Sequence, residues 1–183
     1  RDILTEEAFE NAVMHLLTMG GSTNGILHLQ AIYHEAGLGE LPLSVFDEFS
    51  RKIPQVASIY PASEFDMVDF YEGGGVPAVL KEIEEYLHKD TLTVSGLTMG
   101  EALSRFSYTN NRNMIKTAEE PFAPTGGVAI LKGNIAPLGC VIKPAAVPKH
   151  MFRYSGRAQV FTTEEESYQA VLEGRVKPGT CMV

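Results

Sequence analysis

The chain has 183 residues, of which 44% are hydrophobic and 21% charged, and its formal net charge is −8. This composition is typical of one globular domain or pieces of two, and the acidic balance argues against a nucleic-acid binder, which needs basic clusters facing phosphates. No stretch reaches the roughly 20 apolar residues of a membrane-spanning helix, and no signal peptide opens the chain. We therefore expect neither a nucleic-acid nor a membrane partner.

The first helix is predicted by apolar residues that follow Thr5. Thr5 can cap this helix, and Glu6 and Glu7 place negative charge in its first turn, where the helix dipole favours it. The residues that repeat at helical spacing and should face the core are Ala8, Phe9, Ala12, Val13, Leu16 and Leu17. His15 falls off this stripe, so we expect it in solvent.

A glycine pair, Gly20-Gly21, should end the first helix, and three small polar residues follow it: Ser22, Thr23 and Asn24. Backbone N–H groups at a helix start lack partners inside the helix, and a glycine pair lets a ligand approach the backbone closely. The turn can therefore hold a carboxylate or a phosphate. The alternative is purely structural: Gly20 ends one helix, Gly21 turns the chain and Ser22 caps the next helix.

The second helix should run from about residue 22 to residue 36. Its apolar residues point almost all round, which predicts deep burial. Asn24, His28 and Glu35 nevertheless lie along one line of the helix. Polar groups on a buried helix need partners or water, so this line either reaches a functional site or contains a satisfied core histidine.

The second half of the chain reads as a β-rich domain with covering helices, and the boundary should lie near residue 90. Strands are predicted at residues 128–131, 140–142 and 158–161, and another begins at residue 176. Two overlapping capping boxes open a helix between the last two strands, Thr162 with Glu165 and Thr163 with Glu166.

The two cysteines, Cys140 and Cys181, lie far apart and have no CxxC partner. We interpret them as reduced, buried thiols of a cytoplasmic protein. They are too few to hold an iron–sulfur cluster alone, which usually takes roughly three or four thiolates.

The segment Gly20–Asn24, followed by Leu27-His28-Leu29, resembles a signature of the dihydroxy-acid and 6-phosphogluconate dehydratases. Further similar segments follow in the same order along nearly the whole chain, at residues 67–69, 74–79, 92–96, 126–137 and 157–161. Gly25, where alanine is common in the family, and residues 143–146 depart from the pattern. We expect these departures to affect the choice of substrate more than the membership of the chain in this family.

The resemblance implies a mixed α/β fold and an internal piece of a longer polypeptide. Residues 1–90 would be the C-terminal helical part of a cluster-bearing α/β domain. Residues 91–183 would be the first part of a β-barrel-like C-terminal domain, similar to the swivelling domain of aconitase. Family members assemble as dimers or tetramers, so a homodimer or homotetramer is expected.

The resemblance also implies a reaction: a 2,3-dihydroxy carboxylic acid loses water and becomes a 2-keto acid, with an iron–sulfur cluster and magnesium as cofactors. The first choice of substrate is the dihydroxy acid of branched-chain amino-acid biosynthesis, and an aldonic acid or 6-phosphogluconate is the alternative. An alternative of another class is a non-catalytic module that binds small acids.

In the family, the cluster cysteines lie before the segment that matches Gly20–Asn24, and one magnesium carboxylate and the catalytic serine lie after the position that matches Val183. We therefore expect no catalytic or metal-binding residue within this chain, and the isolated chain should be inactive. What the chain would contribute is part of the active-site wall. The candidates are Gly21, Ser22, Thr23 and Asn24.

Overall fold

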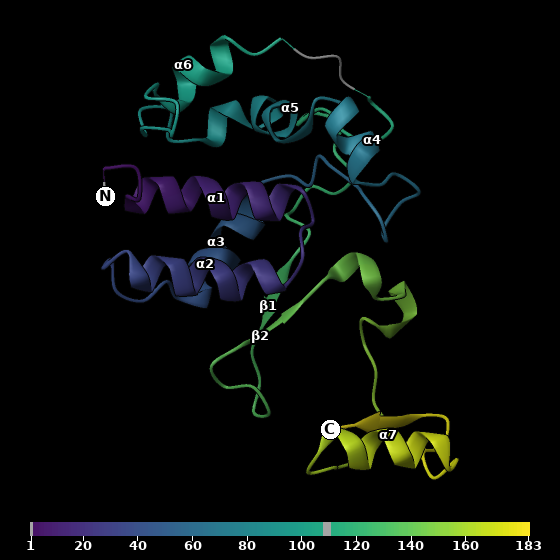
Figure 1. The fold of residues 1–183 in the computed structure, drawn as a ribbon. Helices are drawn as coiled ribbons and strands as arrows, with labels where there is room; N and C mark the ends of the chain where they lie inside the picture. Colours follow the sequence, from purple (N-terminus) through teal and green to yellow (C-terminus); the bar gives the residue numbers. More distant parts are fainter. Residues whose placement is uncertain (1, 108–110) are drawn as a thin grey trace. The chain divides into compact units, whose positions relative to one another are not determined.

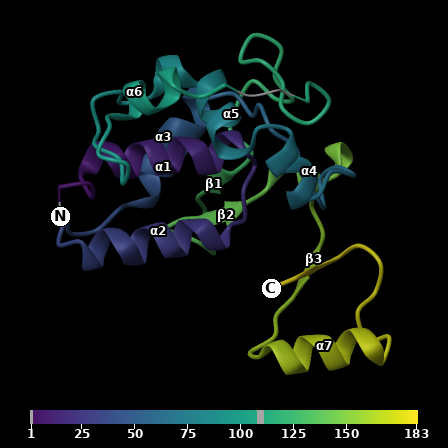
Figure 2. The ribbon, with the colours of Figure 1, turned by 45° about the horizontal axis from the view of Figure 1, so that its top comes forward.

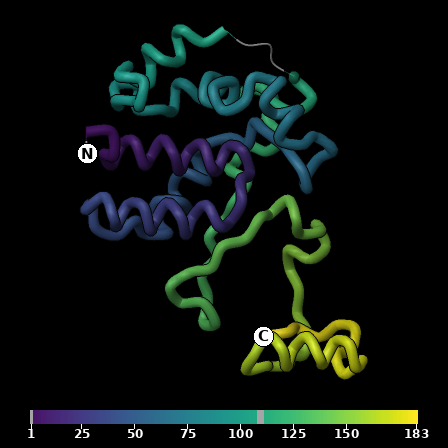
Figure 3. The backbone as a smooth tube through the Cα atoms, viewed as in Figure 1, coloured from purple at the N-terminus to yellow at the C-terminus, as the bar shows by residue number. Residues whose placement is uncertain are grey.

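The computed structural model describes residues 2–107 and 111–183 and divides into two compact units, residues 1–146 and 147–183 (Figures 1 and 3). The first unit contains α1 (Glu6–Thr18), α2 (Asn24–Glu35), α3 (Leu43–Lys52), α4 (Met67–Glu72), α5 (Gly75–Glu82), η1 (Glu84–Tyr86), α6 (Met99–Ser104), β1 (Ala129–Leu131), β2 (Cys140–Ile142) and η2 (Pro144–Ala146). The second unit contains η3 (Lys149–Met151), β3 (Arg157–Gln159), α7 (Glu164–Leu172) and β4 (Thr180–Met182). None of the described helices is long and apolar enough to cross a membrane.

Helix α1 lies at the centre of the first unit. It packs against α2, α3 and α5, and Figures 1 and 2 show it between α2 and α5. Phe9, Val13 and Leu17 of the predicted stripe are buried, and each such side chain contributes roughly 1.5–3 kcal/mol to folding. Thr5 caps the helix, since its Oγ1 accepts a hydrogen bond from the Ala8 N–H at 3.2 Å. The predicted helix and its cap are confirmed, whereas Ala8, Ala12 and Leu16 of the predicted stripe are only half-buried.

Helix α2 forms as predicted, but the expectation of deep burial is wrong. Ile26 and Tyr33 are buried, whereas Leu27 is 66% exposed and Ile32 is 49% exposed. The helix packs on α1 through one face, where the ring of Tyr33 meets Phe9 edge-on at 4.9 Å between centroids. Apolar residues all round a helix predict burial only if other elements cover its remaining faces.

The polar line on α2 is consequently a surface feature. Asn24, His28 and Glu35 are all exposed in the first unit. They therefore need no buried partner, and the interpretation of His28 as a satisfied core histidine is wrong for this structure.

Strands β1 and β2 pair antiparallel, with Ile130 opposite Val141, close to the predicted positions. Strand β1 packs against α3, where Ser50 Oγ donates a hydrogen bond to the Val128 carbonyl. The expectation of buried cysteines is wrong: Cys140 in β2 is exposed and Cys181 in β4 is half-buried, although both are free. Each belongs to a strand that pairs on one side with a single other strand of the described chain.

The second unit is a small β–α–β unit in which β3 and β4 pair parallel (Figure 2). Thr163 caps the connecting helix α7, because its Oγ1 accepts from the Glu166 N–H at 3.1 Å. The Glu166 carboxylate in turn accepts from the N–H and hydroxyl of Thr162, and these hydrogen bonds hold the pKa of Glu166 below its usual value. Helices and short sheets thus coexist, and the predicted mixed class is confirmed.

Candidate functional site

The predicted turn at Gly20-Gly21 does end α1. Gly20 has a left-handed backbone with φ of +57°, which glycine adopts without strain. Its N–H donates to the Leu17 carbonyl at 3.1 Å, and the Gly21 N–H donates to the Leu16 carbonyl at 2.9 Å. The carbonyls that the end of a helix leaves unpaired are satisfied within the turn.

A second glycine-rich segment, Gly126-Gly127, packs against this turn. The Gly127 N–H also donates to the Leu17 carbonyl, at 2.8 Å. A Cβ at position 127 would lie 2.4 Å from the Gly20 Cα, so the two backbones touch at a distance that no side chain allows. Both glycine segments belong to the stretches that resemble the family, but their contact was not predicted from the sequence.

The segment around Gln55 also holds the end of α1 in place through hydrogen bonds to Thr18. The Thr18 hydroxyl donates to the Pro54 carbonyl at 2.6 Å, and the Thr18 carbonyl accepts from the N–H groups of Val56 and Ala57. Gln55 Nε2 donates to the Ala57 carbonyl at 3.1 Å. Thr18 and Gln55 are both buried, and the sequence analysis missed them because neither belongs to a recognisable motif. A polar residue at the end of an apolar stripe is the only local signal.

The polar residues Ser22, Thr23 and Asn24 directly follow this hydrogen-bonded turn. Ser22 and Asn24 are exposed and Thr23 is half-buried. The Asn24 N–H donates to Ser22 Oγ at 3.2 Å, and the N–H groups of Gly25 and Ile26 donate to the carbonyls of Ser22 and Thr23. Because these amides already have acceptors, the turn offers a ligand its side-chain hydroxyls and amide more readily than its backbone.

An apolar groove of about 520 Å³ borders the turn, on the face of α1 between α2 and α5. Its lining residues are Ala8, Asn11, Ala12, His15, Leu16, Met19, Gly21, Gly25, His28, Leu29, Val76, Leu80 and Met99. Gly21 belongs both to the groove and to the candidate site.

His15 lines this groove, so the expectation of a solvated histidine is wrong. Its Nε2 is buried and has no hydrogen-bond partner among the described residues. Burial disfavours the charged imidazolium and lowers the pKa of His15 from 6.5 to about 4. The side chain is therefore neutral near pH 7. It lies in the groove with Ala12 and Leu16 of the predicted stripe, and residues of α2 and α5 line the same groove.

The described residues do not fit an iron–sulfur cluster or a magnesium site by themselves. No three histidine, cysteine, aspartate or glutamate side chains among them gather closely enough to hold a metal ion. Cys140 and Cys181 belong to different compact units.

Comparison with known families gives two matches that together cover both halves of the chain. Residues 1–102 match the sequence model described as dihydroxy-acid/6-phosphogluconate dehydratase N-terminal, and residues 113–183 match the C-terminal counterpart. The chain belongs to the dihydroxy-acid/6-phosphogluconate dehydratase family. The resemblance seen in the sequence is confirmed.

Individual relatives agree with this assignment. The chain is 45% identical over 183 residues to a dihydroxy-acid dehydratase of Ignicoccus hospitalis, an alignment that covers 99% of this chain and 33% of that protein. It is 46% identical over 186 residues to a dihydroxy-acid dehydratase of Methanosarcina barkeri, covering 100% of this chain and 34% of the relative. The chain thus spans about a third of the length of the curated relatives it matches.

Proposed function

We propose that the complete protein containing these residues is a dihydroxy-acid dehydratase, a hydro-lyase that converts a 2,3-dihydroxy carboxylic acid to a 2-keto acid. The observation that carries this proposal is an identity of about 45% along the whole chain to proteins of that name. The substrate we favour is 2,3-dihydroxyisovalerate, the dihydroxy acid of branched-chain amino-acid biosynthesis. Aldonic acids and 6-phosphogluconate are the alternatives within the same family.

The reaction is an elimination followed by tautomerisation. The proton leaves C2, the hydroxyl leaves C3 as water, and the resulting enol rearranges to the 2-keto acid. Its barrier is lowered by groups held in place where charge develops. A rigid wall that orients the substrate hydroxyls serves this purpose, since misplaced reacting atoms cost large factors in rate.

We assign part of this wall to Gly21, Ser22, Thr23 and Asn24. The support is their placement: the turn beneath them is fixed by contacts from Gly127 and by the segment of Gln55. The side-chain amide of Asn24 and the hydroxyls of Ser22 and Thr23 match the hydroxyl and carboxylate oxygens of a dihydroxy acid in hydrogen-bonding character.

Further properties of the complete protein belong to the same proposal. We infer an iron–sulfur cluster and magnesium held mostly by residues outside 1–183, a homodimer or homotetramer, and a cytoplasmic location. We also propose that residues 1–90 end the cluster-bearing domain and residues 91–183 begin the β-rich domain. The match of two separate family models, to residues 1–102 and 113–183, supports a division in this part of the chain.

The test is turnover by the complete protein, purified without oxygen. It is incubated separately with 2,3-dihydroxyisovalerate, 6-phosphogluconate and gluconate, and the 2-keto acid is measured. We expect a keto acid from 2,3-dihydroxyisovalerate at the highest kcat/KM, and none from the 183-residue chain alone. Binding of these acids without any keto acid would instead favour the non-catalytic module.

A further inference from the structure

We propose that the groove between α1, α2 and α5 is the docking site of a segment of the same polypeptide that lies outside residues 1–183. This inference rests on the proposed function, in which the chain is part of a family protein about three times as long. The occupant should present apolar side chains and one hydrogen-bonding group, which meets His15.

The chemistry of the groove favours an apolar occupant. Its walls are mostly alanine, leucine, valine and methionine side chains from the three helices, with Met99 of α6 at one side. Asn11 is among the polar lining residues, but its amide is already bonded to His88 and Thr91. Ile32, one helical turn after His28 on α2, is a further exposed apolar residue at 49%.

His15 supplies the second observation. Its Nε2 is the one buried side-chain nitrogen or oxygen that lacks a hydrogen-bond partner within residues 2–107 and 111–183. An unmade hydrogen bond in a buried position costs roughly 1–3 kcal/mol. A neighbouring segment that donates to or accepts from the neutral imidazole would remove this cost.

A small acid substrate does not suit this groove. Carboxylates and hydroxyls require several polar partners when they leave water, and the groove offers few. The neutral imidazole of His15 supplies no positive charge to balance a carboxylate.

The distribution of exposed apolar residues favours the same polypeptide over a second copy of this chain. Large apolar side chains that do not line the groove are also exposed, such as Leu138 at 89% in the first unit and Val160 at 70% in the second. Extensive apolar exposure marks surfaces that normally have a neighbour. A single contact between two copies at the groove would leave these residues uncovered, whereas the remaining two thirds of a family polypeptide is long enough to cover them.

The experiment is site-specific photo-crosslinking in the protein encoded by the complete gene. Benzoylphenylalanine replaces Leu29, which lines the groove, and replaces Glu40, an exposed loop residue, as the matched control. Isotopically heavy and light proteins are mixed before irradiation, and crosslinked peptides are identified by mass spectrometry. We expect position 29 to link to peptides outside residues 1–183, within chains of one isotopic label, and position 40 to give only background.

Several outcomes would overturn the proposal. These are links between heavy and light chains, which indicate a second copy, and links confined to residues 1–183. Equal labelling at positions 29 and 40, no link at position 29, or a gene that encodes only these residues would overturn it as well. Because the site of crosslinking is read independently of turnover, an inactive protein that still shows the expected links refutes the proposed function alone.

A pair of substitutions gives a second measurement. Ala12→Leu fills the groove, and Ala31→Leu makes the same change on the exposed face of α2. In the complete protein we expect Ala12→Leu to lower the melting temperature by roughly 5 °C, because overpacking an occupied space displaces its occupant. Ala31→Leu is the control for helix propensity. Equal melting temperatures for the two variants would contradict an occupied groove.

Discussion

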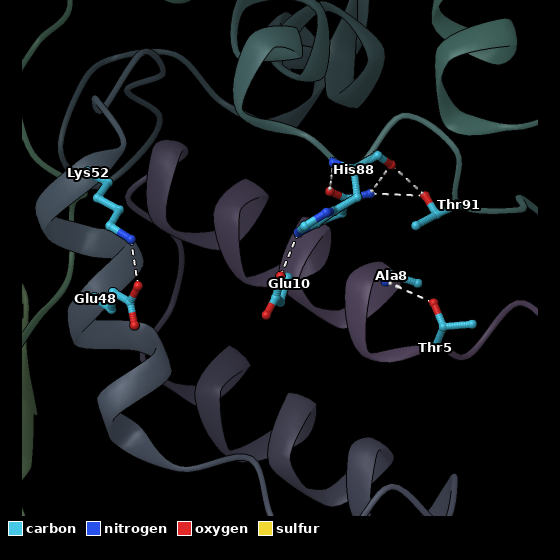
Figure 4. Close-up of polar contacts among 8 residues, drawn as sticks. Thr5, Ala8, Glu10, Glu48, Lys52, His88 and Thr91 are labelled. Carbon is cyan, nitrogen blue, oxygen red and sulfur yellow. Dashed lines mark hydrogen bonds and ion pairs between the residues drawn. The ribbon is translucent and has the colours of Figure 1, made fainter.

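Asn11 and His88 exchange hydrogen bonds across 77 residues of sequence. Asn11 Nδ2 donates to the His88 carbonyl at 3.0 Å, and the His88 N–H donates to Asn11 Oδ1 at 2.9 Å. Asn11 Nδ2 also reaches Thr91 Oγ1, and the His88 ring meets the Glu10 carboxylate at 2.5 Å (Figure 4). One amide side chain therefore joins the middle of α1 to the segment that follows η1.

The first prediction concerns this junction. Asn11 is only 3% exposed, and Asn11→Ala removes the acceptor of the half-buried His88 N–H and one donor to the His88 carbonyl, which also accepts from Thr91 Oγ1. We expect the free energy of unfolding to fall by roughly 2–4 kcal/mol, measured by urea denaturation. Asn134→Ala, in an exposed loop, is the matched control and should change it by less than about 0.5 kcal/mol. Similar losses in both variants would show that the hydrogen bonds of Asn11 contribute little.

The second prediction concerns the contact between the two glycine segments. Gly127→Ala places a methyl group 2.4 Å from the Gly20 Cα, and a backbone atom cannot move aside as a side chain can. We expect a loss of roughly 2–4 kcal/mol in the free energy of unfolding, because the turn and residue 127 must separate. The control is Gly133→Ala, where a Cβ meets nothing within 4 Å. A Gly127→Ala protein as stable as the control would mean that the two segments are not in contact.

The third prediction concerns pH. The folded-state pKa of His15 is about 4 and its ordinary value is 6.5, so the unfolded chain binds a proton more readily between these values. The contribution of His15 to stability is thus constant above about pH 6.5. It is lost as the pH falls toward 4, by at most about 1.4 kcal/mol per pH unit.

His15→Leu removes this titration while keeping an apolar group in the groove. Urea unfolding of the wild-type chain and the variant at pH 7.5, 6.0 and 5.0 should show their difference in free energy of unfolding shifting in favour of the variant as the pH falls. Parallel profiles would show that the imidazole is not buried.

Local features of the sequence predicted local features of the structure. The Thr5 cap, the Gly20 helix end and the Thr163 cap follow from short-range hydrogen bonding between residues three or four apart, and all three are present. The pairing of residues 129–131 with 140–142 is nearly as local, because a single loop joins the two strands.

Features that depend on distant neighbours could not be predicted. The apolar character of α2 indicated burial, yet exposure is decided by what packs on its outer face. His15 was placed in solvent because its position on α1 was known, but not the positions of α2 and α5 around it. The contact of Gly20 with Gly127 is a consequence of the tertiary fold, and no local pattern in the sequence predicts it.

The fourth prediction addresses the proposed wall of the active site. The side chain of Asn24 is exposed and makes no hydrogen bond with any described residue, so it does not stabilise the fold in this way. Asn24→Ala in the complete protein should therefore leave the melting temperature unchanged. Loss of one hydrogen bond to the reacting substrate, worth roughly 1.4 kcal/mol, lowers kcat/KM about tenfold. His34→Ala, at the other end of α2, is the matched control and should leave both quantities unchanged.

The most direct test of the account is therefore kcat/KM of the complete protein for 2,3-dihydroxyisovalerate, measured for the wild type, Asn24→Ala and His34→Ala. We expect formation of the 2-keto acid by the wild type, a decrease of about tenfold in Asn24→Ala at unchanged melting temperature, and wild-type values for His34→Ala. Absence of the 2-keto acid would contradict the proposed reaction, and equal kcat/KM in all three proteins would contradict the placement of the turn in the active-site wall.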